Sequence, residues 1–243
     1  MILGVIPARY GSTRFPGKVL ARLNGKPLVQ VVWDRAVAAK RLDRLLIATD
    51  HPKVLKAAER FGGEAVLTPE NLNSGTDRVW AAVKGIDAQV IINIQGDEPL
   101  VTPTMVDQLV EALERDSLVQ MATLRYPMKG AKGYNDPNVV KVVTDAHGWA
   151  LYFSRSPLPA VKGERRAPSV WHKHIGVYGY RRELLKQFVH WPRSSLETAE
   201  GLEQLRALEH GVRIKVLDSP VNTIGVDTPD DLHRVEALLK DNA

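Results

Sequence analysis

The stretch Ile2-Leu3-Gly4-Val5-Ile6-Pro7-Ala8 decides the fold class, because it reads as a short buried strand that runs into a polar, glycine-rich loop. No basic segment precedes it and Pro7 breaks it, so it does not fit a signal peptide. Similar strands are predicted at residues 45–49, 64–68 and 90–95, with helices between them at residues 27–40, 52–61 and 77–85. This alternation is typical of an α/β fold with a parallel sheet and crossover helices.

The pattern changes from about residue 119. Strands are predicted at residues 119–126, 139–144, 149–153 and 172–180 with no long helix between them, which indicates antiparallel pairing. A helix at 195–210, a strand at 213–217 and a last helix after Pro229 are predicted next. We therefore expect a single α/β domain over residues 1–243, Rossmann-like with a mostly parallel sheet, that carries an inserted antiparallel lobe at about residues 125–190.

Composition and charge exclude several classes of protein. At roughly 150 residues per domain, the chain of 243 residues corresponds to about 1.6 domains, and 44% hydrophobic with 25% charged residues is ordinary for a folded protein. The absence of cysteine excludes disulfides, thiol nucleophiles and zinc–thiolate sites. The net charge of +5 is small and no basic stripe alternates with aromatic residues, so nucleic-acid binding is disfavoured.

No apolar run is long enough to span a membrane, so we expect no membrane insertion and a cytoplasmic location. Segment 156–169 contains three prolines and the cations Lys162, Arg165 and Arg166. We interpret this segment as an exposed loop with a solvated charged surface.

The loop after the first strand, from Pro7 to Lys18, contains the cations Arg9, Arg14 and Lys18 together with two glycines and two hydroxyl side chains. Exposed backbone N–H groups and positive side chains in one turn suit a polyphosphate. The loop is not a Walker A motif, because five residues rather than four separate its glycines and Val19 stands where a hydroxyl is needed. The alternative is an ordinary glycine-rich surface turn.

Two aspartates are candidates for a metal site. Asp97 follows the fourth strand, and Asp227 precedes the last helix. A neighbouring threonine, Thr102 or Thr228, is the expected helix cap in each place, so neither aspartate is needed for capping. Mg²⁺ takes one or two carboxylates and fills its other positions with water and phosphate. The pair therefore predicts a shared Mg²⁺ site, although each aspartate alone is as compatible with a plain loop carboxylate.

The start of the third helix, Ser74–Arg78, offers hydroxyl and N–H groups to a base or a ribose. A plain cap by Ser74 or Thr76 is an equally good local explanation. In strand 172–180, two-residue alternation places His174 and Tyr178 on one face beside Gly176, which makes a floor that a sugar can approach. A lone strand histidine is more often structural than catalytic.

Segment Leu202–Arg206 offers a further pair of polar side chains. Glu203 and Gln204 lie off its leucine stripe, which gives some support to a sugar-binding face. The alternative is an exposed Glu203–Arg206 pair at helical spacing.

Taken together, these segments resemble the 3-deoxy-D-manno-octulosonate cytidylyltransferase (CMP-Kdo synthetase) family. The resemblance covers essentially the whole chain and keeps the motifs in order, at residues 7–18, 48–50, 74–78, 95–99, 152–155, 174–180, 202–206 and 226–229. The related sialic-acid cytidylyltransferases begin with a similar strand but have a different lysine loop. They are not expected to carry segments 153–155 and 202–206 in this form.

The resemblance implies a Rossmann-like nucleotidyltransferase with a sugar-binding and dimer-forming lobe, and thus a homodimer. It implies that the anomeric hydroxyl of Kdo attacks the α-phosphate of CTP, that Mg²⁺ is the cofactor and that pyrophosphate leaves, for lipopolysaccharide biosynthesis. The acceptor is an acidic eight-carbon sugar.

The resemblance also assigns roles to individual residues. The catalytic set is Arg9, Lys18, Asp97 and Asp227, of which Asp97 and Asp227 bind the metal. The nucleotide-binding set is Pro7, Ala8, Arg9, Arg14, Lys18, Ser74, Gly75, Arg78 and Gln95. The sugar-binding set is Arg155, His174, Tyr178, Glu203 and Gln204, with the fork of Arg155 suited to the sugar carboxylate.

One segment departs from the family pattern. Residues 192–197 read Pro-Arg-Ser-Ser-Leu-Glu where the family has Pro-Ser-Pro-Leu-Glu, which leaves open whether the acceptor is Kdo or a relative such as the 8-amino sugar. Ser194 and Glu197 still predict a capping box. Two alternatives stay open: a cytidylyltransferase for a nine-carbon nonulosonate, and an inactive nucleotide-sugar-binding protein, against which the presence of Lys18, Asp97 and Asp227 argues.

Overall fold

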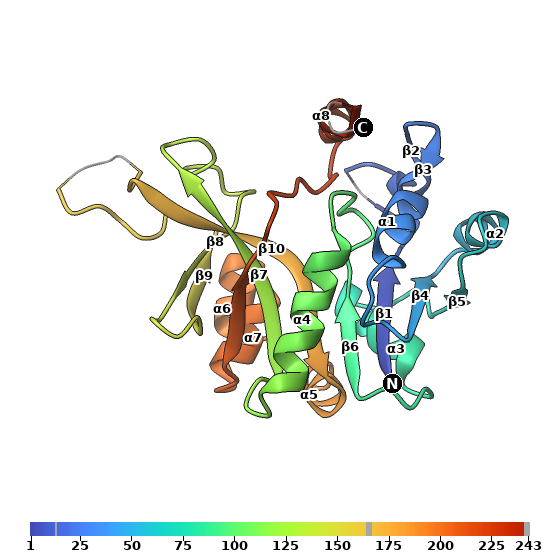
Figure 1. The fold of residues 1–243 in the computed structure, drawn as a ribbon, viewed down its shortest axis with the longest axis horizontal. Helices are drawn as coiled ribbons and strands as arrows, with labels where there is room; N and C mark the ends of the chain where they lie inside the picture. Colours follow the sequence, from blue (N-terminus) through green and yellow to red (C-terminus); the bar gives the residue numbers. More distant parts are fainter. Residues whose placement is uncertain (13, 164–166, 241–243) are drawn as a thin grey trace. The chain divides into compact units, whose positions relative to one another are not determined.

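The computed structural model describes residues 1–12, 14–163 and 167–240 (Figure 1). Arg165 and Arg166 of the predicted surface loop, and Thr13 of the loop after the first strand, lie outside this range. The chain folds as two compact units, one from Met1 to Val110 together with the segment from Asn222 on, and one from Glu111 to Val221. Within the described residues, no helix combines the length and the apolar character needed to cross a bilayer.

The first unit is built on a parallel sheet, as the alternating sequence pattern predicts. Its strands lie in the order β6-β1-β4-β5. The strands are β1 (Ile2–Pro7), β4 (Arg44–Thr49), β5 (Ala65–Leu67) and β6 (Val90–Asn93). The helices of this part of the chain are α1 (Leu28–Ala36), α2 (Pro52–Arg60), α3 (Gly75–Val83), α4 (Pro103–Arg115, which continues into the second unit) and α8 (Pro229–Lys240). A short 3-10 helix, η1 (Lys18–Leu20), and a hairpin of β2 (Arg22–Leu23) and β3 (Lys26–Pro27) complete it.

Strand β1 is the centre of this unit. Leu3, Val5 and Ile6 are completely buried, and both α1 and α3 contact the strand (Figure 1). A strand covered in this way needs apolar side chains on both faces, which is why its sequence reads as an unbroken apolar run. The parallel strands also end at one edge of the sheet, so the loops that follow β1, β4 and β6 meet there.

The second unit contains the strands that the second half of the sequence predicts. Antiparallel pairs join β7 to β10, β10 to β8, and β8 to β9, while β11 runs parallel to β7. The strands are β7 (Met121–Lys129), β8 (Lys141–Thr144), β9 (Ala150–Ser154), β10 (Val170–Arg181) and β11 (Ile214–Asp218). Helix α5 (Arg182–Phe188) follows β10 and was not anticipated from the sequence.

The prediction of one helix over residues 195–210 is wrong. The segment forms two short helices, α6 (Ser195–Glu200) and α7 (Gln204–Glu209). Gly201 has a φ of 61°, in the left-handed region, and therefore ends α6 with its N–H bonded to the carbonyl of Glu197. The predicted capping box of Ser194 and Glu197 is present at the start of α6.

A buried ion pair joins these two helices. Arg206 Nε and Nη2 donate to Glu197 Oε2 and Oε1 at 2.7 and 2.5 Å, and the two residues are 6% and 5% exposed. The Arg206 guanidinium also lies 4.6 Å from the ring centroid of Phe188. The alternative of an exposed pair between Glu203 and Arg206 is therefore wrong, because Arg206 points into the unit.

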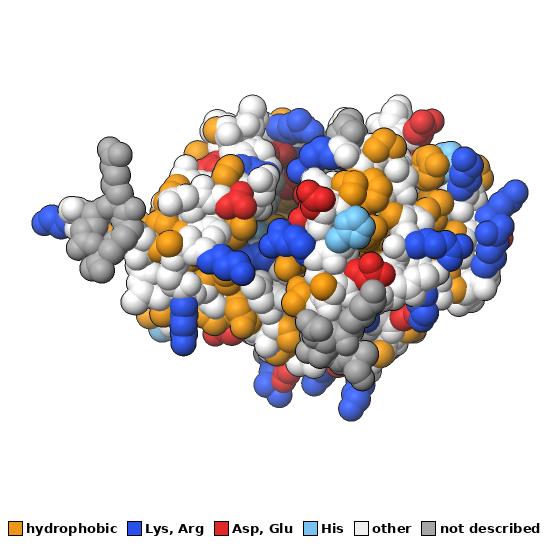
Figure 2. Space-filling model, turned by 90° about the horizontal axis from the view of Figure 1, so that it is seen from above, with side chains coloured by type: hydrophobic (Ala, Val, Ile, Leu, Met, Phe, Trp, Pro, Cys, Tyr) orange, Lys and Arg blue, Asp and Glu red, His pale blue; other side chains and the backbone are white. Residues whose placement is uncertain are grey.

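The face of the molecule in Figure 2 shows the described Lys and Arg side chains scattered among acidic, apolar and uncharged ones. This distribution agrees with the small net charge of +5. It gives no continuous basic track on that face, among the residues that the structure describes.

Replacing Arg206 with Met should destabilise the protein by about 3 to 5 kcal/mol, because it leaves the carboxylate of Glu197 buried without its partner. Chemical denaturation monitored by tryptophan fluorescence measures this change. The matched control is Arg115→Met, which removes an exposed pair with Glu111 and should cost less than about 0.5 kcal/mol. Equal effects of the two substitutions would contradict the role assigned to the buried pair.

Candidate active site

The loop after β1 carries the three cations that the sequence predicts for a polyphosphate. Arg9 and Arg14 are exposed, while the side chain of Lys18 is only 12% exposed. Gly17, with a φ of 68°, turns the chain so that Lys18 begins η1. A residue with a Cβ adopts that conformation at a cost, so glycine suits the turn.

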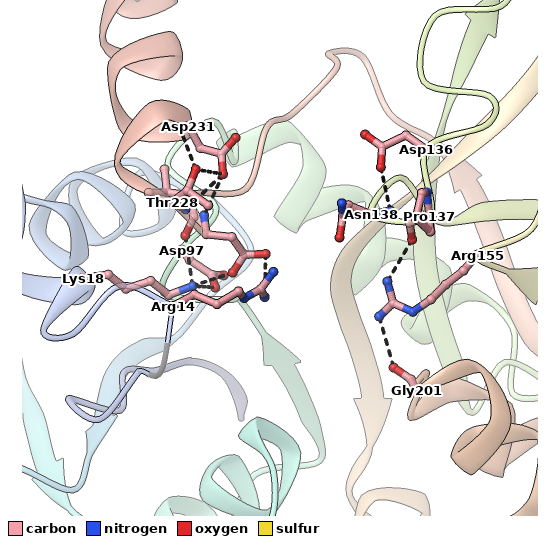
Figure 3. A network of polar contacts seen from close by, with 12 residues as sticks. Arg14, Lys18, Asp97, Asp136, Pro137, Asn138, Arg155, Gly201, Thr228 and Asp231 are labelled. Carbon is pink, nitrogen blue, oxygen red and sulfur yellow. Dashed lines mark hydrogen bonds and ion pairs between the residues drawn. The ribbon is translucent and has the colours of Figure 1, made fainter.

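Lys18 joins three segments that are far apart in the sequence (Figure 3). Its Nζ lies 2.6 Å from Asp97 Oδ2, 2.9 Å from Asp227 Oδ1 and 2.9 Å from the carbonyl of Val226. Arg14 Nη2 lies 3.0 Å from Asp227 Oδ2. The structure thus brings four of the predicted site residues into one cluster, which we call the Lys18 cluster: Arg14, Lys18, Asp97 and Asp227.

Neither aspartate of this cluster caps a helix, as the sequence predicts. Thr102 Oγ1 accepts the N–H of Met105 at the start of α4. Thr228 Oγ1 accepts the N–H of Asp231, and Asp231 Oδ2 accepts the N–H of Thr228 in return. The two capping arrangements leave the carboxylates of Asp97 and Asp227 directed at Lys18.

Contacts within the Lys18 cluster shift the pKa of Lys18 and of Asp227. Burial alone would lower the pKa of Lys18, but attraction by Asp97 and hydrogen bonds to Asp97 and Asp227 outweigh it and raise this pKa. Burial pushes the pKa of Asp227 upward, and the bond to Lys18, together with Arg14, lowers it below its usual value. Lys18 and Asp227 are therefore charged at neutral pH.

A second group of predicted residues lies at the ends of β1 and β6. A methyl group added at Gly75 would lie 3.6 Å from Gln95 Oε1 and 3.7 Å from Pro7 Cγ. A Cβ at Gly96 would lie 2.8 Å from the carbonyl of Pro7, so only glycine fits there. Pro7, Gly75 and Gln95 are thus neighbours, as expected for a nucleotide site, whereas the side chain of Ala8 is fully buried.

Sequence reasoning missed Asn93, which lies beside Gln95. Gln95 Nε2 donates to Asn93 Oδ1 at 3.4 Å. Asn93 is fully buried, and its Nδ2 makes no hydrogen bond among the described residues. Its position as the last residue of β6, directly before the Gln95 segment, is the signal that could have found it.

Ser74 and Arg78 have partners within the protein. Ser74 Oγ accepts the N–H of Asp77 and donates to Asp77 Oδ2, so the capping alternative for Ser74 is realised. Arg78 is 3% exposed, and its Nη2 lies 3.0 Å from Asp50 Oδ2. Burial lowers the pKa of Arg78, with opposing attraction by Asp50 and further repulsion by Arg9. The Arg78 guanidinium therefore belongs to a buried ion pair beside the loop and not to the Lys18 cluster.

In the second unit, Arg155 is held by backbone carbonyls (Figure 3). Its Nε donates to Glu200, its Nη1 to Pro137 and its Nη2 to Gly201, at 2.7, 2.9 and 3.4 Å. A guanidinium has five N–H groups. Two therefore remain after these three bonds, one on each terminal nitrogen, and they can still bind a carboxylate.

Lys141, which the sequence analysis did not single out, supports Arg155 from below the surface. It is 0% exposed, and its Nζ donates to the carbonyls of Asp136 and Arg155 at 2.7 and 2.9 Å. Burial lowers its pKa, against opposing attraction by Asp136 and Glu200. Lys141 thus holds the backbone of Arg155, and the bonds to Pro137, Glu200 and Gly201 hold its side chain.

The predicted regular alternation of β10 is wrong at residues 176–177. The pairing of β10 with β7 shifts between Ile175 and Tyr178, which is the signature of a bulge. The rings of His174 and Tyr178 nevertheless lie 5.5 Å apart. Both side chains are largely buried, at 8% and 9% exposed. The two rings therefore remain neighbours although the strand is irregular between them.

Thr123 determines the tautomer of His174. Thr123 Oγ1 lies 3.0 Å from His174 Nε2, and it lies 3.1 and 2.9 Å from the carbonyls of Ile175 and Val177. A hydroxyl has one hydrogen, which goes to a carbonyl, so it accepts from the Nε2–H of His174. The Nδ1 atom of the neutral ring is therefore a hydrogen-bond acceptor.

Burial raises the pKa of Tyr178, and the nearby charges of Tyr180 and Glu203 raise it further, so Tyr178 and Glu203 share one environment. Gln204 is 3% exposed, and its Nε2 makes no hydrogen bond to the described part of the chain. Tyr178 thus lies near both His174 and Glu203, and Gln204 follows Glu203 directly in the chain.

His174 should make the stability of the protein depend on pH. Burial, with a smaller effect of Lys173, lowers its pKa from 6.5 to about 3, so below pH 6.5 the unfolded chain binds a proton that the folded protein does not. Stability is therefore complete above pH 6.5 and falls on acidification, by about 1.4 kcal/mol per pH unit down to the folded pKa. His174→Gln, whose Nε2 can still donate to Thr123, should lose this dependence.

Denaturation at several pH values measures the difference between the two proteins. His172, whose pKa is also lowered by burial, titrates in both and cancels in the comparison. Parallel curves for the wild type and His174→Gln between pH 6.5 and 4 would contradict a neutral, buried His174.

Known proteins resemble this chain over essentially its whole length. The sequence model of the family described as cytidylyltransferase matches residues 3–214. A 3-deoxy-manno-octulosonate cytidylyltransferase of Syntrophobacter fumaroxidans is 49% identical over 100% of this chain and 98% of its own length, and one of Syntrophotalea carbinolica is 47% identical over 98% of both. A solved structure of a CMP:2-keto-3-deoxy-manno-octonic acid synthetase in complex with CTP has a TM-score of 0.93 and 40% identity, over 100% of this chain and 99% of that one. The chain therefore belongs to the cytidylyltransferase family, among the 3-deoxy-manno-octulosonate cytidylyltransferases.

Proposed function

We propose that the protein transfers CMP from CTP to the anomeric hydroxyl of 3-deoxy-D-manno-octulosonate (Kdo), or of a close relative such as its 8-amino derivative, and releases pyrophosphate for lipopolysaccharide biosynthesis. The names of the full-length relatives and the CTP-bound structure support this proposal. The structural observation that carries it is the Lys18 cluster, in which two cations and two carboxylates from three separate segments meet at the end of the parallel sheet.

The chemistry of the transfer explains this choice of residues. The sugar oxygen forms a bond to the α-phosphorus, the bond from that phosphorus to the bridging oxygen breaks, its electron pair leaves with pyrophosphate, and the hydroxyl proton is lost to solvent. Such a reaction depends on positioning and on neutralising negative charge, and it needs no covalent nucleophile on the protein. Arg9, Arg14 and Lys18 would bind the triphosphate oxygens, and the end of β1 with Gly75 and Gln95 would bind the nucleoside.

We propose Mg²⁺ as the cofactor, held by Asp97 and Asp227. The Lys18 ammonium group already lies between the two carboxylates. One oxygen of each lies within 2.9 Å of its nitrogen, so the two carboxylates are close enough to share one cation. The described residues contain no cluster of three or more metal-binding side chains, so the chain itself would supply two carboxylates. When bound, Mg²⁺ would neutralise phosphate charge, and water and phosphate oxygens would complete its shell.

The second unit would bind the acceptor. The two remaining N–H groups of Arg155 suit the sugar carboxylate, because a guanidinium binds a carboxylate through two parallel hydrogen bonds. The Nδ1 acceptor of His174 and the amide of Gln204 suit sugar hydroxyls. Glu203, beside Tyr178, would accept from another hydroxyl.

We also propose that the protein acts in the cytoplasm as a homodimer. Exposed apolar side chains on the strands of the second unit support an interface there, because Leu151 of β9 is 62% exposed and Val170 of β10 is 46% exposed. Sedimentation of the purified protein tests the oligomeric state.

A pyrophosphate-release assay with purified protein and Mg²⁺ tests the function. We expect release with CTP and Kdo or 8-amino-Kdo, and little release with ATP, GTP or UTP, or with neuraminate as the acceptor. Asp97→Asn and Asp227→Asn should each lower kcat by about a hundred- to thousandfold, because each removes a charge needed in the transition state.

The matched control is Asp34→Asn, an exposed carboxylate of the same unit that pairs with Lys26 and should not change the rate. Release with neuraminate alone would favour a nonulosonate enzyme, and no release with CTP and either eight-carbon sugar would overturn the proposal. A wild-type rate in one aspartate variant would remove that residue from the active site.

A further inference from the structure

Segment Ala48–Asp50 belongs to the family motifs, yet the proposed reaction gives it no role. Asp50 follows β4 directly, and its side chain is 9% exposed. Its carboxylate bridges two elements: Oδ1 accepts the backbone N–H of Tyr10 at 2.9 Å, and Oδ2 accepts from Arg78 Nη2 at 3.0 Å. Asp50 therefore connects the loop after β1 to helix α3.

The Arg78 side of this bridge is rigid. Arg78 Nη1 donates to Thr68 Oγ1 at 2.6 Å and to the carbonyl of Pro69 at 3.2 Å. Thr68 in turn donates from its N–H and its hydroxyl to the carbonyl of Thr49. These bonds hold the Arg78 guanidinium in one place, so it fixes the orientation of the Asp50 carboxylate.

Tyr10, on the other side, is attached at three points. Its N–H is bonded to Asp50, its carbonyl accepts the N–H of Gly17 at 3.2 Å, and its ring stacks on His51 with centroids 4.1 Å apart and planes inclined by 25°. His51 cannot turn freely, because its Nδ1 accepts the N–H of Lys53 and caps α2. The stacking surface for Tyr10 is therefore fixed as well.

The position of Tyr10 in the loop gives this attachment its significance. Arg9 directly precedes Tyr10, and Lys18 directly follows Gly17, the residue that bonds to the Tyr10 carbonyl. One anchored residue thus holds the backbone beside two of the three predicted triphosphate cations, Arg9 and Lys18. A loop held in its binding conformation loses less entropy when it binds its ligand.

We propose that Asp50, with Arg78 behind it, is a positioning residue that acts through Tyr10 to hold the loop in the conformation that binds the triphosphate of CTP. This inference rests on the proposed function and assigns a task to two residues outside the Lys18 cluster. The charges agree with it: a lone acid beside a triphosphate would repel it, whereas Asp50 is paired with Arg78 and contributes no net charge.

Binding of CTP and of inorganic tripolyphosphate, each measured by isothermal titration calorimetry, tests the proposal. Asp50→Ala should raise both dissociation constants by about ten- to a hundredfold, the range for losing a hydrogen bond to a charged group. Asp50→Asn keeps an oxygen that accepts from Tyr10 and should raise them clearly less. Tyr10→Leu, which removes the stacking on His51 and the contact of the ring with Lys53 but keeps the backbone bonds, should raise them about two- to tenfold. The KM for the sugar should stay within about twofold in all three, a split that general destabilisation would not produce.

The matched control is Arg44→Met, which removes the surface pair of β4 with Glu64 and should leave both dissociation constants unchanged. Unchanged tripolyphosphate binding in Tyr10→Leu and folded Asp50→Ala would overturn the proposal, as would equal effects of Asp50→Ala and Asp50→Asn. If Asp50→Ala fails to fold, Tyr10→Leu decides alone. If the variants weaken tripolyphosphate binding as expected but the wild type releases no pyrophosphate, the proposed function fails while the positioning role of Asp50 stands.

Discussion

The contacts of the Lys18 ammonium group hold together three segments of the first unit that are far apart in the sequence. This group satisfies two carboxylates and one backbone carbonyl that arrive from opposite parts of the chain. Without a cation between them, Asp97 and Asp227 would repel each other at short distance. Under the proposed function, a metal ion would compete with Lys18 for the two carboxylates, and a triphosphate would compete with them for Lys18. The same contacts would therefore affect both stability and binding.

In the second unit, too, cationic side chains are bonded to oxygen atoms of the protein. Lys141 and Arg155 are held by backbone carbonyls at short distances, and Arg206 by the carboxylate of Glu197. Removing such groups from water is costly unless their donors are satisfied. Their bonds fix turns that carry no regular secondary structure, such as the segment around Gly201. Buried charge in this protein thus supplies order at the places where the helices and strands end.

Much of this arrangement could be predicted from local patterns. The apolar run at residues 2–8 indicates a buried strand, and Ser194 with Glu197 indicates a helix start, because these signals lie within a few residues. The break at Gly201 was missed because apolar residues recur every three positions across it, at Leu196, Ala199, Leu202 and Leu205. The partner of Arg78 could not be predicted, since Asp50 lies on another element and only the tertiary fold brings them together.

The last segment of the chain packs back onto the first unit, where Val226 and Val235 join Leu23 and Leu28 in one apolar cluster. The ribosome therefore completes the whole of the second unit before it makes Asp227. During synthesis, the sheet of the first unit can form early, but its acidic pair stays incomplete until Asp227 is made and its apolar cluster until Val235 is made. A chain that stopped before Asp227 would thus lack both the second carboxylate of the Lys18 cluster and the Val235 side chain of this apolar cluster.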